Sequence, residues 1–147
     1  MRYTLQIDID RPRDAVVALF DDPANLSQWQ PGFIRMEPID GEPGQPGART
    51  RLVYRHGKGE MEMVETITER ELPERFSGTY ENDMAYNTMV NRFEALDTNR
   101  TRWTSEIEFT ARTWPMRLMM WFMPGAFRKQ SWKFMEQFRI FAEREIG

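Results

Sequence analysis

The chain has 147 residues, of which 40% are hydrophobic and 29% charged, and its formal net charge is -3 at pH 7. This composition is typical of one globular domain, and the negative charge disfavours binding to nucleic-acid phosphates. The absence of cysteine excludes disulfides, thiolate nucleophiles and cysteine-ligated metal sites. We therefore expect a single domain over residues 1–147 that does not bind nucleic acid.

The first predicted element is a strand over residues 3–9. Apolar residues occupy every second position, at Tyr3, Leu5, Ile7 and Ile9, which is the period of a strand with one buried face. The acidic Asp8 falls where a signal peptide would have an uninterrupted apolar stretch. We therefore expect no export signal and a cytoplasmic location.

Residues 12–30 are predicted to form two short helices. Pro12 suits the first helical turn, and Asp14 is favourable near the positive end of the helix dipole. The apolar stripe of the first helix comprises Ala15, Val16, Leu19 and Phe20. The second helix carries Leu26 and ends at Pro31, because proline disfavours helix at the residue before it.

From Phe33 onward the pattern is that of strands joined by short turns. The turns are predicted at residues 41–47, 56–59, 71–74, 82–85 and 97–100. Connections this short suit antiparallel hairpins, because a parallel crossover needs about a dozen residues. The segment is therefore expected to be a meander of six strands.

The chain is expected to end in helix, beginning near Trp114 and interrupted at Pro124-Gly125. Beyond the interruption, one face is predicted from residues at helical spacing: Phe127, Ser131, Phe134, Phe138 and Phe141. This apolar face must pack on the sheet, because isolated helices of this length are marginal in water.

This order of elements resembles the helix-grip fold of the START-like, or SRPBCC, superfamily. The resemblance covers nearly the whole chain and is carried by the order of several short motifs: Asp10-Arg11-Pro12, Asp22-Pro23, Trp29-Gln30-Pro31-Gly32, residues 44–49, Leu72-Pro73-Glu74-Arg75-Phe76 and the closing helix. It is nearest to small bacterial proteins grouped with polyketide cyclases and dehydrases. The resemblance implies an α+β fold, with a seven-stranded antiparallel sheet curved around a long C-terminal helix. It also implies a cavity for lipids, polyketides, sterols, isoprenoid quinones or other aromatic ligands, but no universal catalytic motif.

Strand alternation predicts which residues line that cavity. Glu60 and Glu62 are expected to face solvent, so the alternate residues of their strand point inward. The predicted lining of the sheet is Leu52, Tyr54, Met63, Glu65, Phe76, Tyr80, Met89, Asn91, Phe93, Trp103 and Ser105. The predicted lining of the helical segment is Met119, Phe127, Ser131, Phe134, Met135 and Phe138. This apolar wall with a few polar groups is the composition of a ligand pocket.

Glu65 is the candidate catalytic residue. No arginine or lysine is expected on the inward face to neutralise it, so it needs water, a hydroxyl, an amide or a ligand as partner. Alternatively, Glu65 lies at a wet cavity mouth or beyond a bulge and is simply solvated. Asn91 either forms a structural hydrogen bond to the backbone or contacts the ligand. The methionines either fill the core or form a deformable pocket wall.

No metal ion or cofactor is predicted. His56 is the single histidine and lies in a predicted turn, whereas a metal site or a serine nucleophile would need it elsewhere. The glycines of residues 41–47 lack the lysine of a phosphate-binding loop, and no helix follows them.

Residues 112–133 combine apolar and basic character. No acidic residue occurs between Glu108 and Glu136, while the basic residues are Arg112, Arg117, Arg128, Lys129 and Lys133. One interpretation is that Leu118, Met119, Phe122 and Met123 close one end of the cavity and belong to the core. The others are peripheral contact with an anionic membrane, or a self-association surface such as a homodimer interface.

Three functions remain open from the sequence. The first is binding or transport of a hydrophobic small molecule between sheet and helix. The second is a cyclase or dehydratase in which Glu65 transfers a proton and Tyr54, Tyr80 or Asn91 stabilises an enolate-like oxygen. The third is delivery of a lipid or quinone at a membrane through residues 112–133.

Overall fold

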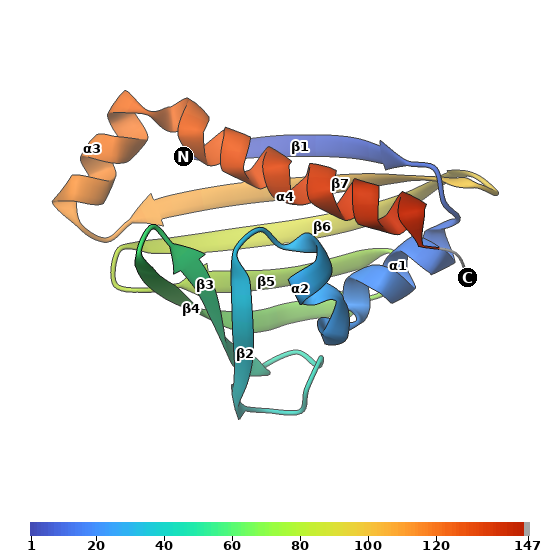
Figure 1. Cartoon of the computed structure of the whole chain (residues 1–147), viewed down its shortest axis with the longest axis horizontal. Helices are drawn as coiled ribbons and strands as arrows, with labels where there is room; N and C mark the ends of the chain where they lie inside the picture. The colour runs from blue at the N-terminus through green and yellow to red at the C-terminus, as the bar shows by residue number, and fades with distance from the viewer. Residues whose placement is uncertain (146–147) are drawn as a thin grey trace.

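A computed structural model describes residues 1–145 of the chain, and Figure 1 shows its arrangement. The strands are β1 (Arg2–Ile9), β2 (Phe33–Asp40), β3 (Arg49–His56), β4 (Gly59–Glu71), β5 (Arg75–Glu81), β6 (Ala85–Asp97) and β7 (Arg100–Ala111). They form one antiparallel sheet in the order β1-β7-β6-β5-β4-β3-β2. The helices are α1 (Arg13–Asp21), η1 (Pro23–Asn25), α2 (Leu26–Trp29), α3 (Trp114–Phe122) and α4 (Pro124–Arg144).

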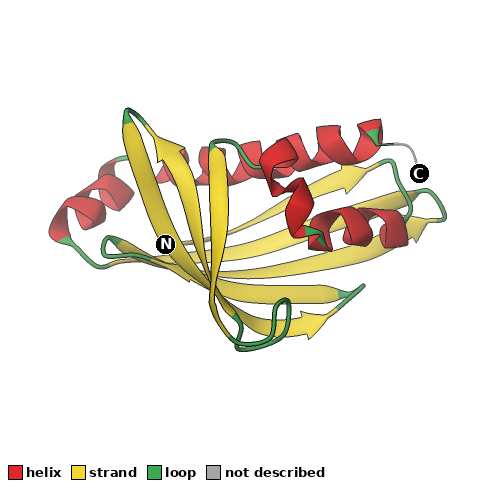
Figure 2. Ribbon diagram, turned by 60° about the horizontal axis from the view of Figure 1, so that its bottom comes forward, coloured by secondary structure: helices red, strands yellow, loops and turns green. Residues whose placement is uncertain are grey.

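This architecture confirms the predicted fold class. Two short α-helices separate β1 from β2, the next six strands form a meander, and the C-terminal helical segment divides at Met123. Figure 2 shows the curved sheet with the helices on its concave side, and α3 lies at the opposite end of the molecule from α1. We call the concave surface of the sheet the inner face. The C-terminal helix α4 covers only part of it.

The pairing register confirms the predicted strand parity. Leu52 pairs with Met63, and Glu65 pairs with Tyr80. Direct cross-strand partners point to the same side of a sheet. The same alternation continues through the remaining pairs Gly78–Met89, Asn91–Ser105, Phe93–Trp103 and Trp103–Ile7. One side of all these strands therefore forms the inner face.

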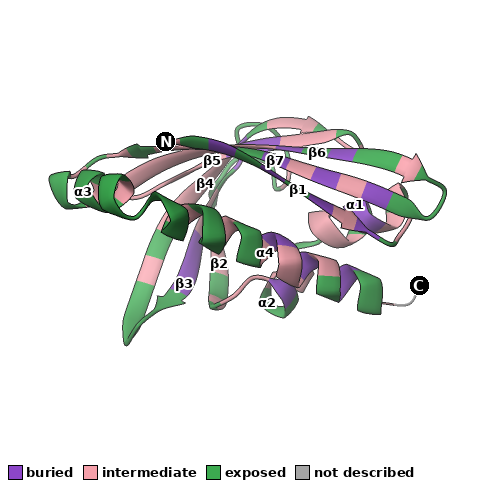
Figure 3. Cartoon of the chain, turned by 90° about the horizontal axis from the view of Figure 1, so that it is seen from above, coloured by how far each residue is buried: buried purple, intermediate pink, exposed green. Residues whose placement is uncertain are grey.

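The core occupies the end of the inner face nearest α1. Phe138 of α4 is 0% exposed and contacts the rings of Phe20, Trp29 and Trp103, with centroid distances of 5.9, 5.0 and 5.3 Å. Buried residues of β1, α1 and the second half of α4 surround this cluster, as the burial colouring of Figure 3 shows. Fully burying each such side chain contributes about 1.5–3 kcal/mol, so this end of the molecule holds α4 in place.

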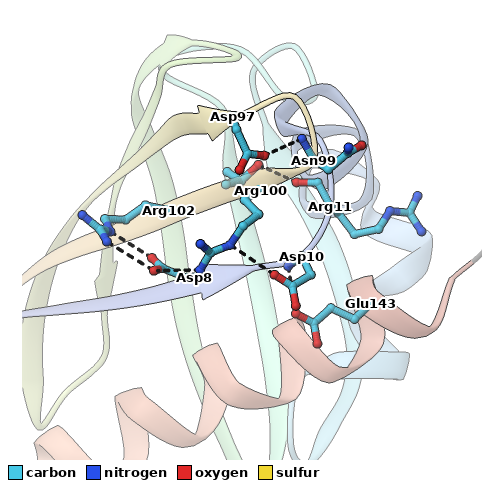
Figure 4. A network of polar contacts seen from close by, with 9 residues as sticks. Asp8, Asp10, Arg11, Asp97, Asn99, Arg100, Arg102 and Glu143 are labelled. Carbon is cyan, nitrogen blue, oxygen red and sulfur yellow. Dashed lines mark hydrogen bonds and ion pairs between the residues drawn. The ribbon is translucent and has the colours of Figure 1, made fainter.

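A network of polar contacts on the protein surface also connects the elements at this end of the molecule (Figure 4). Arg102 of β7 donates to Asp8 of β1 at 2.9 Å, and Arg100 forms an ion pair with Asp10 at 3.3 Å. The backbone N–H of Asp10 donates to Glu143 of α4 at 2.8 Å. These contacts connect the β1–β7 pair to the end of α4 beside the aromatic core.

A bulge in β4 corrects one prediction about the inner face. The register shifts between Ile67 and Glu69, after which Arg70 pairs with Phe76. The expectation of no inward arginine is therefore wrong, because the extra residue moves Arg70 onto the side occupied by Phe76. Its guanidinium donates to both carboxylate oxygens of Asp21, at 2.7 and 2.6 Å. Arg70 thus anchors α1 to the sheet.

Candidate ligand-binding site

Part of the inner face, from the margin of the aromatic core outward, is incompletely covered. Eight of the residues predicted to line a cavity are half-buried, although they lie on the concave side: Met63, Glu65, Phe76, Tyr80, Met89, Phe127, Ser131 and Phe134. A close-packed interior leaves few voids larger than a water molecule. Residual exposure therefore shows that solvent-sized space adjoins these side chains, which come from β4, β5, β6 and α4.

The remaining predicted lining residues have other environments. Eight are buried among protein atoms: Leu52, Tyr54, Asn91, Phe93, Trp103, Ser105, Met135 and Phe138. Met119 of α3 is 48% exposed. The predicted set thus comprises half-buried residues, fully buried residues and one exposed residue on α3; the half-buried residues form the half-open region, and the buried residues around Trp103 and Phe138 form the closed region.

Glu65 and Tyr80 form the main polar contact of the half-open region. The Tyr80 hydroxyl donates a hydrogen bond of 2.8 Å to Oε2 of Glu65. Burial raises the pKa of the Glu65 carboxyl above its ordinary value, and the hydrogen bond from Tyr80 only partly opposes this effect. Burial, reinforced by the nearby Glu65 charge, also raises the pKa of the Tyr80 phenol. Both groups of the pair therefore hold their protons more tightly than the same groups do in water.

Gly78 provides room for this contact. A side chain at position 78 would begin 3.5 Å from the Tyr80 hydroxyl and 3.1 Å from the backbone oxygen of Thr66. The Tyr80 ring therefore lies over the position where another residue would place its side chain. A side chain that extends beyond Cβ at position 78 would compete with the Tyr80 ring for this space, which Gly78 leaves free.

Tyr54 extends the polar group toward α2. Its hydroxyl donates to Oε1 of Gln30 at 2.7 Å, and its ring lies 6.2 Å from that of Phe134 on α4. Burial, followed by the Glu65 charge, raises the pKa of the Tyr54 phenol. We call Glu65, Tyr80, Tyr54 and Gln30 the inner polar cluster. It presents a carboxyl, two phenols and an amide beside apolar surface.

Asn91 has a structural role within the closed region. Its side-chain oxygen accepts a hydrogen bond of 2.9 Å from the indole N–H of Trp103, and both residues are buried. Asn91 therefore makes a structural hydrogen bond, but its partner is the Trp103 indole and not the backbone that was expected. The neighbouring Ser105 hydroxyl is buried without a hydrogen-bond partner among the described residues.

Replacing Asn91 with Ala is expected to lower the free energy of unfolding by about 1–3 kcal/mol, because the buried Trp103 N–H loses its acceptor. Urea denaturation followed by tryptophan fluorescence measures this change. Asn87→Ala is a control on the same strand, since no hydrogen bond to the Asn87 side-chain oxygen is present among the described residues. Equal effects of the two substitutions would contradict the assignment.

Ser131 contacts β1 rather than the inner polar cluster. Its hydroxyl lies 2.7 Å from the Tyr3 hydroxyl, which also donates to the backbone oxygen of Phe127 at 3.1 Å. Tyr3 was absent from the predicted lining, yet its alternation with Leu5 and Ile7 is a signal that could have identified it. Gln30 had no such signal, because it lies in the loop between α2 and β2.

Two hollows lie outside the inner face. One, of about 600 Å³, is an open groove between β1 residues 4–6 and α4 residues that include Arg128, Lys129 and Trp132. The other, of about 500 Å³, continues along β1 and α4 toward Arg139 and Glu143. Neither is lined by a member of the predicted set, so the half-open inner face is a separate surface.

Comparison with known proteins agrees with this geometry. Residues 1–139 match the family described as polyketide cyclase / dehydrase and lipid transport. The chain belongs to this family. The fold is the helix-grip fold of the SRPBCC superfamily, as the sheet, the long C-terminal helix and the two short helices after β1 indicate. Membership of the polyketide cyclase/dehydrase family associates the fold with hydrophobic ligands or cyclase chemistry without selecting between them.

Solved structures similar to this family member share its fold at low sequence identity. The Zhui aromatase/cyclase from a Streptomyces species has a TM-score of 0.81 and 14% identity, covering 98% of this chain and 94% of that chain. A conserved protein from Geobacillus kaustophilus has a TM-score of 0.80 and 12% identity, covering 97% and 95%. Ara h 8.0201 has a TM-score of 0.77 and 10% identity, covering 99% of both chains. The search of curated proteins found no match.

Proposed function

We propose that the protein binds a hydrophobic small molecule on the half-open inner face, with the inner polar cluster as its anchor. The observation that carries this proposal is the set of half-buried apolar residues around Glu65 and Tyr80 on the concave side of the sheet. Ligand sites are mostly apolar with a few placed polar groups. Met63, Met89 and Phe134 supply the apolar surface.

The inner polar cluster favours a neutral ligand with a hydroxyl or carbonyl group. Tyr80 can donate to a ligand oxygen, and Glu65 can accept from a ligand hydroxyl or, when protonated, donate to a carbonyl. A ligand carboxylate would be repelled by ionised Glu65, because no described cation pairs with that residue. Neutral polyketides, isoprenoids and aromatic compounds fit these conditions.

The proposal is tested with the neutral apolar fluorophore N-phenylnaphthylamine and by native mass spectrometry of protein purified from its own host. Met89 pairs with Gly78 near the centre of the inner face, so Met89→Trp is expected to weaken fluorophore binding about tenfold. Thr88→Trp, on the opposite side of the same strand, is the matched control and should bind as the unmodified protein does. Equal binding by both variants, or no binding by the unmodified protein, would contradict the proposal.

The contact between Glu65 and Tyr80 favours an enzyme as the second candidate. A carboxyl with a raised pKa is better suited to donate a proton than a solvated glutamate, and a neighbouring phenol can stabilise a developing enolate oxygen. Asn91 has no role in this mechanism, because its side-chain oxygen accepts a hydrogen bond from the indole N–H of Trp103. With a compound extracted from the native protein as substrate, Glu65→Gln should abolish turnover and preserve affinity. Unchanged turnover would exclude this mechanism.

A further inference from the structure

Helix α3 exposes apolar side chains that the fold does not use. None of its nine residues is buried, and Trp114, Trp121 and Phe122 are 69%, 77% and 73% exposed. Leu118, Met119 and Met123 are exposed as well. The interpretation of this segment as core is therefore wrong. Contiguous apolar surface of this kind marks an interaction site in a monomeric protein.

The exposed residues of α3 are organised on the helix. Trp114, Leu118, Trp121 and Phe122 have the i, i+4, i+7, i+8 spacing of one helical face. The rings of Trp121 and Phe122 stack with centroids 5.5 Å apart. The helix lies at the end of the molecule away from α1 (Figures 1 and 3), so this face is free of the aromatic core.

The charged residues of α3 and of the first turns of α4 are all positive, and the acidic residues near this end, Glu81 and Asp83, lie on β5 and in the β5–β6 turn. Arg112 forms an ion pair with Glu81 at 2.6 Å, and the remaining cations are Arg117, Arg128, Lys129 and Lys133. Within residues 1–145, these four cations form no ion pair, although many arginines of the sheet do. Arg128 and Lys129 also line the groove of about 600 Å³ that adjoins Gly125 at the start of α4. Cations without an ion-pair partner among the described residues therefore lie on α3 and on the part of α4 that follows it directly.

The positive sign of these charges indicates which kind of partner binds the exposed face of α3. A symmetric dimer would bring the same patch of both copies together, and so would oppose cations to cations. An anionic lipid surface instead attracts the cations while its acyl region accepts tryptophan and phenylalanine. The described chain holds no helix with the length and hydrophobicity needed to cross a bilayer, so contact through α3 would be peripheral.

We propose that α3 and the first turns of α4 form a docking surface for anionic membranes. Trp121 and Phe122 enter the interface, and Arg117, Arg128, Lys129 and Lys133 contact lipid phosphates. Short amphipathic segments with aromatic and basic residues bind membranes in this way. The proposal goes beyond ligand binding on the inner face and does not depend on it.

The apolar part is tested by co-sedimentation of the full chain with phosphatidylcholine vesicles containing phosphatidylglycerol. Combined Trp121→Gln and Phe122→Gln should weaken binding at least about tenfold, because both apolar anchors are lost. Ile140→Gln is the matched control, since Ile140 is exposed on the second half of α4, and it should bind as the unmodified protein does. A similar loss in both variants would overturn the proposal.

The charged part is tested by Lys129→Glu, with Lys58→Glu on the exposed β3–β4 turn as control. Removing one interfacial cation weakens binding about fivefold, so this reversal should lower binding at least that much and the control should not. Added salt, or vesicles of phosphatidylcholine alone, should weaken binding of the unmodified protein. Absence of binding to anionic vesicles would overturn the proposal. So would a dimer in sedimentation analysis that dissociates in the Trp121→Gln, Phe122→Gln variant, which would identify a second copy as the partner.

Discussion

Phe138→Ala is expected to lower the free energy of unfolding by about 3–5 kcal/mol, which is typical of a fully buried phenylalanine. Phe138 is 0% exposed and contacts Phe20, Trp29 and Trp103 by edge-to-face packing. Truncation removes these contacts and leaves a cavity at the point where α4, α1, α2 and the sheet meet. The loss should therefore destabilise the whole domain.

Urea denaturation monitored by circular dichroism measures this effect through the transition midpoint at unchanged slope. Phe122→Ala is the matched control, because Phe122 is 73% exposed on α3. It should change the free energy of unfolding by at most about 0.5 kcal/mol. A small effect at Phe138, or equal effects at both positions, would show that the aromatic cluster is not the centre of stability.

Glu65→Gln is expected to stabilise the protein at alkaline pH, by about 1 kcal/mol or more for relieving a poorly solvated carboxylate. Burial raises the pKa of Glu65 above the ordinary glutamate value of 4.5, so the folded chain holds this proton more tightly than the unfolded chain. The stabilising contribution of Glu65 is therefore complete below the unfolded pKa. It is lost as the pH rises through the folded pKa.

Comparison of the variant with the unmodified protein isolates this contribution. The hydrogen bond from Arg102 lowers the pKa of Asp8. The contribution of Asp8 to stability therefore has the opposite pH dependence, because it increases as the pH rises. Both proteins share the contribution of Asp8, so the difference between them should grow as the pH rises above the ordinary glutamate value of 4.5. Glu62→Gln, on the outer side of β4, should show no such growth. A constant difference for Glu65→Gln would mean that the carboxyl is fully solvated.

Much of the fold could be predicted because its signals are local. The alternation of Tyr3, Leu5, Ile7 and Ile9 identified β1, and the short turn segments identified the hairpins that the sheet contains. Pro124-Gly125 likewise indicated the division between α3 and α4. Each of these signals depends on side-chain spacing or on backbone preferences of proline and glycine, which do not need the rest of the chain.

The candidate site was predictable where strand parity held. Parity placed Glu65 and Tyr80 on the same face of the sheet, and the pairing register then showed that they are direct partners. It failed at Arg70, because the bulge after Ile67 depends on how β4 and β5 twist together. Gln30 reaches Tyr54 from a loop, and loops carry no periodicity from which such a contact could be inferred.

The order of strands and helices, the inward set of each regular strand and the family resemblance were determined by the sequence alone, because they follow from residue spacing. Only the tertiary structure decided that Phe138 is packed shut while Met89 and Glu65 keep exposed surface, and that α3 stands outside the core. These outcomes depend on where α4 crosses the curved sheet. That position results from long-range packing between segments more than a hundred residues apart, which no local pattern records.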